Sequence, residues 1–295
     1  MKQREINIKS NDNTLFVTEQ CNNRCIMCCQ PPKRTHDIDS LYEQNIERIK
    51  QAPKNLQSIG ITGGEPTLLG YKLVELIQEI RKELPCTDIH LLSNGRAFKD
   101  SDFTKDIVEV GEDKLILGIP LHSDYAGDHD LIAGSRNAYT ETMKGLYNIA
   151  MQGGIIELRI VMNKLNFSRF LSMAKFIHKN LSFAAWTAFM GMEKTGFADS
   201  KSEKIWIEPI EYQAELDDAV HFLADWYHEV AIYNIPLCLL PKGLYNFAKR
   251  SISDWKNYYL SVCSKCVMKE KCCGLFSTSS APYDGIAPIL SIKDQ

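Results

Sequence analysis

Three cysteines in one short segment constrain the fold of this chain most. Cys21, Cys25 and Cys28 stand four and three residues apart, so one loop can direct three thiolates toward one inorganic cluster. A [4Fe–4S] cluster has four irons, and each iron binds one ligand. Such a loop leaves one iron open to a small molecule, which indicates chemistry rather than a structural role. A zinc loop or a set of buried thiols is the alternative, although zinc usually has paired spacings and four protein ligands.

The length and the charge of the chain limit the expected domain count and the expected partners. A chain of 295 residues can form one barrel-sized domain and a smaller one, and we expect units at 1–200 and 201–295. A net charge of −3 with 24% charged residues gives no basic face, so nucleic acid is not an expected partner. Without a signal peptide or an apolar run of about 18 residues, we expect a cytoplasmic protein with no membrane segment. In that reducing compartment, ten cysteines favour metal ligation over disulfides.

Strand-like and helix-like segments alternate along the first 200 residues. β-branched and aromatic runs predict strands, and apolar residues at helical spacing predict the helices between them. The strands are expected at 14–18, 56–62, 89–92, 115–121, 155–162 and 185–190, and the helices at 39–51, 69–83, 139–151 and 168–179. This alternation predicts parallel strands covered by helices. The expected fold class is α/β, a partial (β/α)6 barrel of the TIM type with a small C-terminal iron–sulfur domain.

Polar turns follow most of the predicted strands. They are the cysteine loop, Gly63-Gly64-Glu65-Pro66, Ser93-Asn94-Gly95, His122-Ser123-Asp124-Tyr125 and Gly191-Met192-Glu193. In such barrels the loops at the carboxyl ends of the strands carry the site, so these turns should meet at one mouth. The glycine pair lets the backbone approach a ligand closely, and the Glu65 carboxylate can accept hydrogen bonds from an ammonium group. Each turn taken alone is also compatible with an ordinary connection.

Two other polar groupings are not expected to be ligands. His90 is predicted to pack as a strand residue, because a lone histidine without a partner is a weak sign of a ligand. Acidic residues and a histidine in the loop beyond residue 122 look like a metal cluster. They are Asp124, Asp128, His129 and Asp130. Because Gly127 lies among them, solvated turn residues or substrate-facing groups are the favoured interpretation.

The spacing Cys-x-x-x-Cys-x-x-Cys after the first strand, with Gly-Gly-Glu-Pro after the second, resembles the radical S-adenosylmethionine (SAM) superfamily. The resemblance extends over essentially the whole chain. In that family the amino and carboxylate groups of SAM chelate the open iron of a [4Fe–4S] cluster. One electron then cleaves SAM to a 5′-deoxyadenosyl radical, which abstracts hydrogen from the substrate. The resemblance implies that Cys21, Cys25 and Cys28 are the cluster ligands, and that a reductant such as flavodoxin or ferredoxin is a partner.

The same resemblance implies which residues contact SAM. Gly63, Gly64 and Glu65 would hold the methionyl amino group. The other candidates are Ser93 and Asn94 beside SAM, Ser123 near the ribose, and Arg136 and Arg159 at the carboxylate. Met27 stands where the family commonly has an aromatic residue, and its soft apolar side chain can still cover an adenine edge. Cys29 is not expected as a fourth ligand, because closing the iron site would expel SAM.

The C-terminal part has a different composition, with an expected helix over 208–228 and an extended segment over 231–240. Its cysteines resemble the twitch or SPASM type of extension, which holds an auxiliary iron–sulfur cluster, here expected as [4Fe–4S]. The implied ligands are Cys238, Cys263, Cys266 and Cys272. A three-ligand cluster with Cys238 in the core and a zinc site are the alternatives. Cys273 is then a spare thiol, either structural or, if accessible, a donor of hydrogen to a substrate radical.

Several segments are most similar to the C-type maturase of the His-Xaa-Ser repeat system. They are residues 21–32, 63–68, 122–134, 190–196 and 251–256. That family is inferred to modify a ribosomally made peptide, so the implied partner is a precursor peptide that is crosslinked, epimerised or oxidised. Because only residues 1–13 precede the first predicted strand, a leader-binding partner protein is also expected. A radical SAM enzyme acting on a nucleotide or other small molecule, and a non-catalytic iron–sulfur redox protein, are the alternatives.

Overall fold

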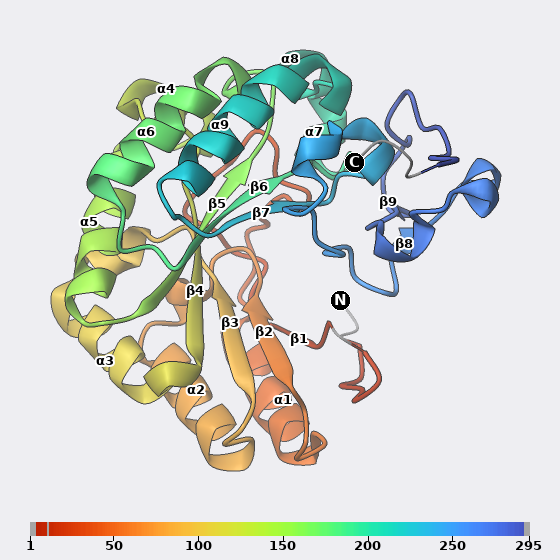
Figure 1. Cartoon of the computed structure of the whole chain (residues 1–295). Helices are drawn as coiled ribbons and strands as arrows, with labels where there is room; N and C mark the ends of the chain where they lie inside the picture. Colours follow the sequence, from red (N-terminus) through yellow and green to blue (C-terminus); the bar gives the residue numbers. More distant parts are fainter. Residues whose placement is uncertain (1–3, 11, 292–295) are drawn as a thin grey trace.

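A seven-stranded parallel sheet forms the centre of the computed structural model, which describes residues 4–10 and 12–291 (Figure 1). The strands are β1 Thr14–Phe16, β2 Ser58–Thr62, β3 Asp88–Leu92, β4 Leu115–Pro120, β5 Ile155–Val161, β6 Trp186–Met190 and β7 Val230–Tyr233. They follow chain order across the sheet, and each neighbouring pair is parallel. The expected α/β class with a partial barrel is confirmed.

Helices cover the outside of the curved sheet (Figure 1). The longer ones are α1 Ile38–Gln51, α2 Tyr71–Glu83, α3 Ser101–Gly111, α5 Ala138–Met151, α6 Phe170–Asn180 and α9 Gln213–Asp225. The short ones are α4 Ala126–Ala133, α7 Phe197–Ser200 and α8 Ser202–Ile205. Parallel neighbours need such crossovers, because a tight hairpin cannot join two strands that run the same way. None of the helices within the described ranges combines the length and the apolar character that a membrane crossing requires.

The two faces of the sheet differ in character, as β5 illustrates. Ile156, Leu158 and Ile160 are buried in the core between sheet and helices. Successive side chains of a strand point to opposite faces, so Glu157 and Arg159 lie on the side away from the helices. We call that side the inner face. Burying each large apolar side chain contributes about 1.5–3 kcal/mol, which fixes the side of the sheet that the helices cover.

The structure contains two helices that the sequence did not predict, and it places part of a predicted extended segment in the sheet. Helix α3 follows the Ser93 turn, and the Asp100 carboxylate caps it by accepting from the N–H groups of Asp102 and Phe103. Helix α4 lies inside the expected loop over 122–134. Strand β7 overlaps the extended segment expected over 231–240, and it pairs with β6 in parallel, so the expectation of six strands in the sheet is one too low. The sheet therefore continues beyond residue 200, where the boundary between the two units was expected.

The helix expected over 208–228 lies before β7 and is formed by a 3-10 turn, Pro209–Tyr212, followed by α9. The chain beyond β7 is mostly turns. Farther on, β8 Asn257–Tyr258 and β9 Leu275–Phe276 form a small antiparallel pair. We call residues 257–291 the C-terminal segment. It is attached to the loop after β6, where the Tyr283 hydroxyl donates to the Met192 carbonyl oxygen over 2.8 Å.

Candidate functional site

The first three cysteines lie in the loop after β1, residues 21–28, which we call the cluster loop. Cys21, Cys25 and Cys28 are partly buried free thiols. Burial, followed by the charge of neighbouring thiolates, raises the pKa of Cys25 and of Cys28 to about 12, and burial also raises the pKa of Cys21. Three such thiolates stay ionised together only beside a strong positive charge. An iron–sulfur cluster provides that charge and prefers thiolate ligands, so this donor set fits one.

The cluster loop is not arranged like a site for one metal ion. No group of three or more His, Cys, Asp or Glu side chains in residues 4–10 and 12–291 could hold a single metal ion. In a zinc site four ligands surround one ion. In a [4Fe–4S] cluster each thiolate binds a different iron, so the thiolates need not meet at one centre. The geometry therefore suits the cluster better than the zinc alternative.

The glycine pair after β2 packs against the backbone that leads into the cluster loop. The Gly64 N–H donates to the Thr18 carbonyl oxygen, and the Glu65 N–H donates to the Gln20 carbonyl oxygen, each over 2.7 Å. A Cβ atom on Gly64 would lie 2.0 Å from the Gln20 oxygen, and one on Gly63 would lie 2.6 Å from the Thr18 oxygen. Only glycine allows this approach. The sequence predicted a close approach to a ligand, whereas the partner seen here is the chain itself.

Glu65 is buried, and its carboxylate accepts hydrogen bonds from the turns after β2 and β3. Its Oε1 atom accepts from the Thr67 N–H over 3.0 Å, and from the hydroxyls of Thr67 and Ser93 over 2.7 Å each. Its Oε2 atom accepts from the Asn94 N–H over 2.7 Å. Burial raises the pKa of Glu65, although these hydrogen bonds oppose the effect. Among the described residues only Asn94 donates to Oε2, so this oxygen can accept another donor.

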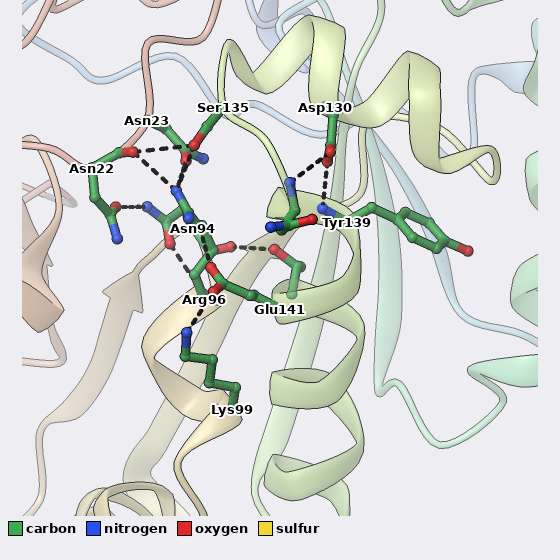
Figure 2. A network of polar contacts seen from close by, with 12 residues as sticks. Asn22, Asn23, Asn94, Arg96, Lys99, Asp130, Ser135, Tyr139 and Glu141 are labelled. Atoms are coloured by element: carbon green, nitrogen blue, oxygen red, sulfur yellow. Dashed lines mark hydrogen bonds and ion pairs between the residues drawn. The ribbon is translucent and has the colours of Figure 1, made fainter.

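Polar side chains connect the cluster loop to the turn after β3, as Figure 2 shows. The Asn94 amide donates to the Asn22 side-chain oxygen over 2.6 Å. The Arg96 Nη1 atom donates to the Asn22 carbonyl oxygen over 2.9 Å, to Asn23 Oδ1 over 2.7 Å and to Ser135 Oγ over 2.8 Å. Arg96 was not predicted as a site residue. The sequence feature that could have identified it is its position directly after the Ser-Asn-Gly turn.

Two histidines at the end of β4 are buried together. The rings of His122 and His129 have centroids 4.9 Å apart, and the His122 N–H donates to His129 Nδ1 over 3.3 Å. Neither ring nitrogen of His122 has a hydrogen-bond partner within the described chain. Burial lowers the pKa of His129 to about 4 and that of His122 well below its usual value. His129 was expected in a solvated or substrate-facing turn. That prediction is wrong, because His129 lies on the buried side of α4.

The acidic residues of the same segment are engaged in structural contacts. Asp124 accepts two hydrogen bonds from the Arg169 guanidinium, over 2.8 and 2.9 Å. Asp130 accepts from the N–H groups of Asn137 and Tyr139 over 2.7 and 2.8 Å, at the start of α5. These contacts order the segment over 122–137. The expectation of solvated turn residues is therefore wrong for both aspartates.

The remaining SAM candidates lie at different depths. Ser123 is fully buried beside His122, and Met27 is buried in a small apolar cluster. Arg136 is exposed just after α4. Arg159 projects from the inner face of β5 and donates to Glu157 over 3.3 Å. Arg159 is thus already paired with a carboxylate of the protein, whereas Arg136 is exposed.

A polar cluster on the inner face was also not predicted from the sequence. A hydrogen bond of 2.7 Å joins His90 Nε2 to Glu157 Oε2, and Trp186 Nε1 donates to Glu157 Oε1 over 3.2 Å. A Cβ atom on Gly118 would lie 3.1 Å from His90 Nε2, so glycine on β4 leaves room for this bridge between β3 and β5. Burial opposes ionisation of Glu157, but the His90 hydrogen bond and the Arg159 charge hold its pKa below the usual value.

His90 was expected to pack as a strand residue without a partner, and the structure gives it one. Its side chain keeps 34% exposure on the inner face. The sequence signal for this cluster lies in β5, where Glu157 and Arg159 stand at alternate positions of an otherwise apolar strand. That spacing places both on one face, but it does not reveal which residues of β3 and β6 they meet.

The C-terminal cysteines meet around one cavity. Cys238, Cys263, Cys266 and Cys272 line one pocket together with apolar side chains such as Leu275. The cysteines reach it from three short 3-10 turns, which span Leu237–Leu239, Ser261–Lys265 and Lys269–Lys271, and from the residues directly after them. The hydrogen bond with the Cys273 thiol lowers the pKa of Cys272 to about 6. The four predicted auxiliary ligands are therefore close together.

Two further thiols differ in accessibility. Cys273 is 3% exposed and packs against Ile252 and Phe276. The accessible thiol that hydrogen donation requires is therefore not found at Cys273. Cys29 is exposed directly after the cluster loop, and Glu193 is among the charged groups near its thiol.

The chain matches the family model described as the Radical SAM superfamily over residues 15–177. GTP 3′,8-cyclase from Petrotoga mobilis is 36% identical over 83 residues, which are 27% of this chain and 25% of that protein. Fe-coproporphyrin III synthase from Methanosarcina barkeri is 26% identical over 163 residues, which are 51% of this chain and 36% of that protein. The chain thus corresponds to less than half the length of either relative.

Among solved structures, SuiB from Streptococcus suis bound to SAM has a TM-score of 0.60 at 14% identity, covering 86% of this chain and 56% of that chain. SuiB has also been solved with the precursor peptide SuiA, and that structure has a TM-score of 0.56 at 12% identity, covering 77% and 49%. At these identities the similarity is one of fold. The family match covers more than half of the 295 residues and includes the cluster loop, so this chain belongs to the radical SAM superfamily.

Proposed function

We propose that this protein cleaves SAM reductively and modifies a ribosomally synthesised peptide by C–H abstraction, leaving a crosslinked, epimerised or oxidised residue. The family membership supports the use of SAM with a [4Fe–4S] cluster. The observation that carries the peptide assignment is the extent of the shared fold. It covers 86% of this chain in the comparison with SuiB, a protein that has been solved with a precursor peptide.

The cluster loop and the turns around it suit the binding of SAM. Cys21, Cys25 and Cys28 would hold the cluster, which supplies the electron for SAM cleavage when bound. Glu65 would bind the methionyl ammonium group through Oε2, since this oxygen accepts one bond among the described residues. Water screens the attraction between a buried carboxylate and a cation less than it screens that of an exposed one. Gly63 and Gly64 would help by placing Glu65 beside the loop.

The other proposed SAM contacts rest on position. The turn that contains Ser93 and Asn94 is tied to Glu65, so it would flank the methionine part. Ser123 at the end of β4 would lie near the ribose, and Met27 near the adenine. Of the two candidates for the SAM carboxylate, the exposed position of Arg136 suits the role better than that of Arg159, which is paired with Glu157.

The inner face of the sheet would receive the peptide. His90 is one-third exposed there and is oriented by Glu157. A carboxylate that accepts from one ring nitrogen leaves the other nitrogen free to bond a substrate group. A surface of this kind can hold a peptide amide or hydroxyl in place while hydrogen is abstracted nearby.

A second iron–sulfur cluster would occupy the cavity of the C-terminal segment. Cys238, Cys263, Cys266 and Cys272 line that cavity, and a closed set of four thiolates suits a [4Fe–4S] cluster that carries electrons or supports structure. A flavodoxin-type or ferredoxin-type reductant and a leader-binding protein would act as partners. The thiols, all free in the structure, would require a reducing compartment, as in the cytoplasm.

A nucleotide substrate is the second candidate, because curated relatives include GTP 3′,8-cyclases. One experiment separates the two. The anaerobically reconstituted protein is reduced with SAM and given either a synthetic peptide with His-Xaa-Ser repeats or GTP, and 5′-deoxyadenosine and product masses are measured.

Peptide-dependent formation of 5′-deoxyadenosine with a mass change of two hydrogens in the peptide would support oxidation or crosslinking. Deuterium uptake from heavy water without another mass change would support epimerisation. Conversion of GTP with no effect of the peptide would overturn the peptide assignment. An absence of SAM cleavage in fully loaded protein would favour a non-catalytic redox role instead.

A further inference from the structure

Arg96 connects the cluster loop to the body of the protein, and no part of the proposed SAM site uses it. Its Nη1 atom donates to the carbonyl oxygen of Asn22 and to the side chain of Asn23, both inside the loop between Cys21 and Cys25. The Arg96 side chain is only 13% exposed. In Figure 2 it projects from the turn after β3 toward these two asparagines.

Different parts of the cluster loop are supported differently. Backbone contacts hold Arg24 and Ile26, whose N–H groups donate to the carbonyl oxygens of Ala133 over 3.0 Å and of Ile132 over 2.9 Å. At Asn22 and Asn23, side chains carry the support, namely Arg96 and the Asn94 amide that donates to Asn22. A planar guanidinium offers several donors in a fixed geometry. Arg96 therefore restricts the segment that positions Cys21 relative to Cys25.

Arg96 and a neighbouring lysine pair with a single carboxylate. Arg96 Nε donates to the Glu141 carboxylate over 2.7 Å, and Lys99 pairs with the other oxygen of the same carboxylate. Two cations thus share one anion. Lys99 is 50% exposed, and within the described residues it has no contact with the cluster loop. Arg96 is the cation that lies against the loop.

We propose that Arg96 is a positioning residue for the SAM cluster, which holds the loop in its ligand-binding conformation and makes the bound cluster easier to reduce. Reduction adds one negative charge to the cluster. A cation in a partly buried position favours the reduced form, because its field is weakly screened there. Net charge and hydrogen bonding around a cluster are among the factors that set its potential. The effect concerns the reduction step and is independent of the substrate that is modified.

The test compares three variants. Arg96→Gln removes the positive charge and the guanidinium donors, and Arg96→Lys keeps the charge alone. Lys99→Gln is the control, because it removes the other cation that pairs with Glu141. Each full-length protein is reconstituted anaerobically and analysed for iron and sulfide. The SAM cluster is identified as the electron paramagnetic resonance signal that changes when SAM is added. Its midpoint potential is then measured by redox titration, and far-UV circular dichroism checks the fold.

We expect Arg96→Gln to lower the equilibrium constant for one-electron reduction of the cluster about tenfold. That change corresponds to a midpoint potential about 59 mV more negative. Arg96→Lys should keep the wild-type potential while it takes up less iron, and Lys99→Gln should match the wild type in both. Loss of the SAM-sensitive signal from folded Arg96→Gln would also support positioning. Wild-type iron content and wild-type potential in Arg96→Gln would overturn the proposal, as would an equal shift in Lys99→Gln.

Discussion

Glu65 and its donors bring three strand ends together at one carboxylate. The residue follows β2, its donors Ser93 and Asn94 follow β3, and its own N–H bonds to Gln20 beyond β1. Removing a buried carboxylate with several donors is destabilising, because each buried donor left without a hydrogen bond costs the folded state about 1–3 kcal/mol. The side chain therefore has a structural function in addition to its proposed contact with SAM.

Glu65→Gln should weaken SAM binding. The amide keeps the size of the side chain, but it cannot offer a full negative charge to an ammonium group, and hydrogen bonds to charged groups contribute about 1.5–3 kcal/mol. We expect the dissociation constant of SAM to rise about tenfold or more, measured by equilibrium dialysis of reconstituted protein. Glu75→Gln, on the exposed side of α2, should leave the affinity unchanged. Equal affinities of Glu65→Gln and the wild type would contradict the assignment.

The buried pair His122 and His129 should make the protein sensitive to acid. Both folded-state pKa values lie below the usual histidine value, near 4 for His129, so the unfolded chain binds protons more readily. Stability is then complete above about pH 6.5 and falls below it, by up to about 1.4 kcal/mol per pH unit for each histidine. Because neither ring nitrogen of His122 has a hydrogen-bond partner within the described chain, His122→Phe should roughly halve this slope between pH 6.5 and 5. Urea unfolding midpoints measured against pH check this, and an unchanged slope would contradict it.

The helices keep the strand ends in register for the site, and α6 shows how. Its buried residues Phe170, Met173, Ala174 and Ile177 recur at helical spacing, and the helix packs beside α9. Such a stripe is the expected pattern for a helix on a sheet. The scaffold behind the site thus depends on apolar contacts far from the cysteines.

Ile177→Ala should destabilise the protein by about 2–5 kcal/mol, because the side chain is completely buried and its removal leaves a cavity. Met151→Ala offers a matched control at the end of α5, where the side chain is 81% exposed. It should change stability by less than about 0.5 kcal/mol. Denaturant unfolding of the two variants measures the difference, and similar midpoints would argue against this packing.

Strand and helix positions were largely predictable because their apolar periodicity is local. The strand over 155–162 and the helix over 139–151 match β5 and α5 to within one residue. The extended segment over 231–240 was expected and overlaps β7, but its place in the sheet was not, because its pairing with β6 is a contact between distant segments. Helix α4 was missed because its buried histidine resembled a polar turn residue.

The site was predictable where spacing carries the chemistry. The three cysteines of the cluster loop were found in this way. So were Cys238, Cys263, Cys266 and Cys272, which line one cavity in the structure. Arg96 and the bridge between His90 and Glu157 were not found. These contacts join different strands, so no local pattern records them. The burial of Cys273 was likewise invisible in the sequence.

Across the whole molecule, the loop after β6 joins the two cysteine sets. At one end the Phe197 N–H donates to the Cys28 carbonyl oxygen over 2.8 Å. Near its middle, Lys256 pairs with Glu193 over 3.0 Å, and the Lys194 N–H donates to Ser279 over 3.0 Å. The C-terminal segment is therefore attached to the same loop that contacts the cluster loop.

The double variant Cys263→Ala/Cys266→Ala should lose the auxiliary cluster and keep the first one. We expect the iron content to fall by half, because two equal clusters are proposed, while SAM still alters the resonance signal of the remaining cluster. Iron analysis and spectroscopy of the reconstituted variant check both points. An unchanged iron content would show that these cysteines hold no cluster.

The central claim is that the cluster loop supports SAM cleavage. The most direct measurement is the yield of 5′-deoxyadenosine from reduced, reconstituted wild type and from Cys21→Ala/Cys25→Ala/Cys28→Ala. The account predicts cleavage in the wild type and none in the triple variant, which should retain its C-terminal cluster as an internal control of folding. Cleavage by the triple variant at the wild-type rate would contradict the account.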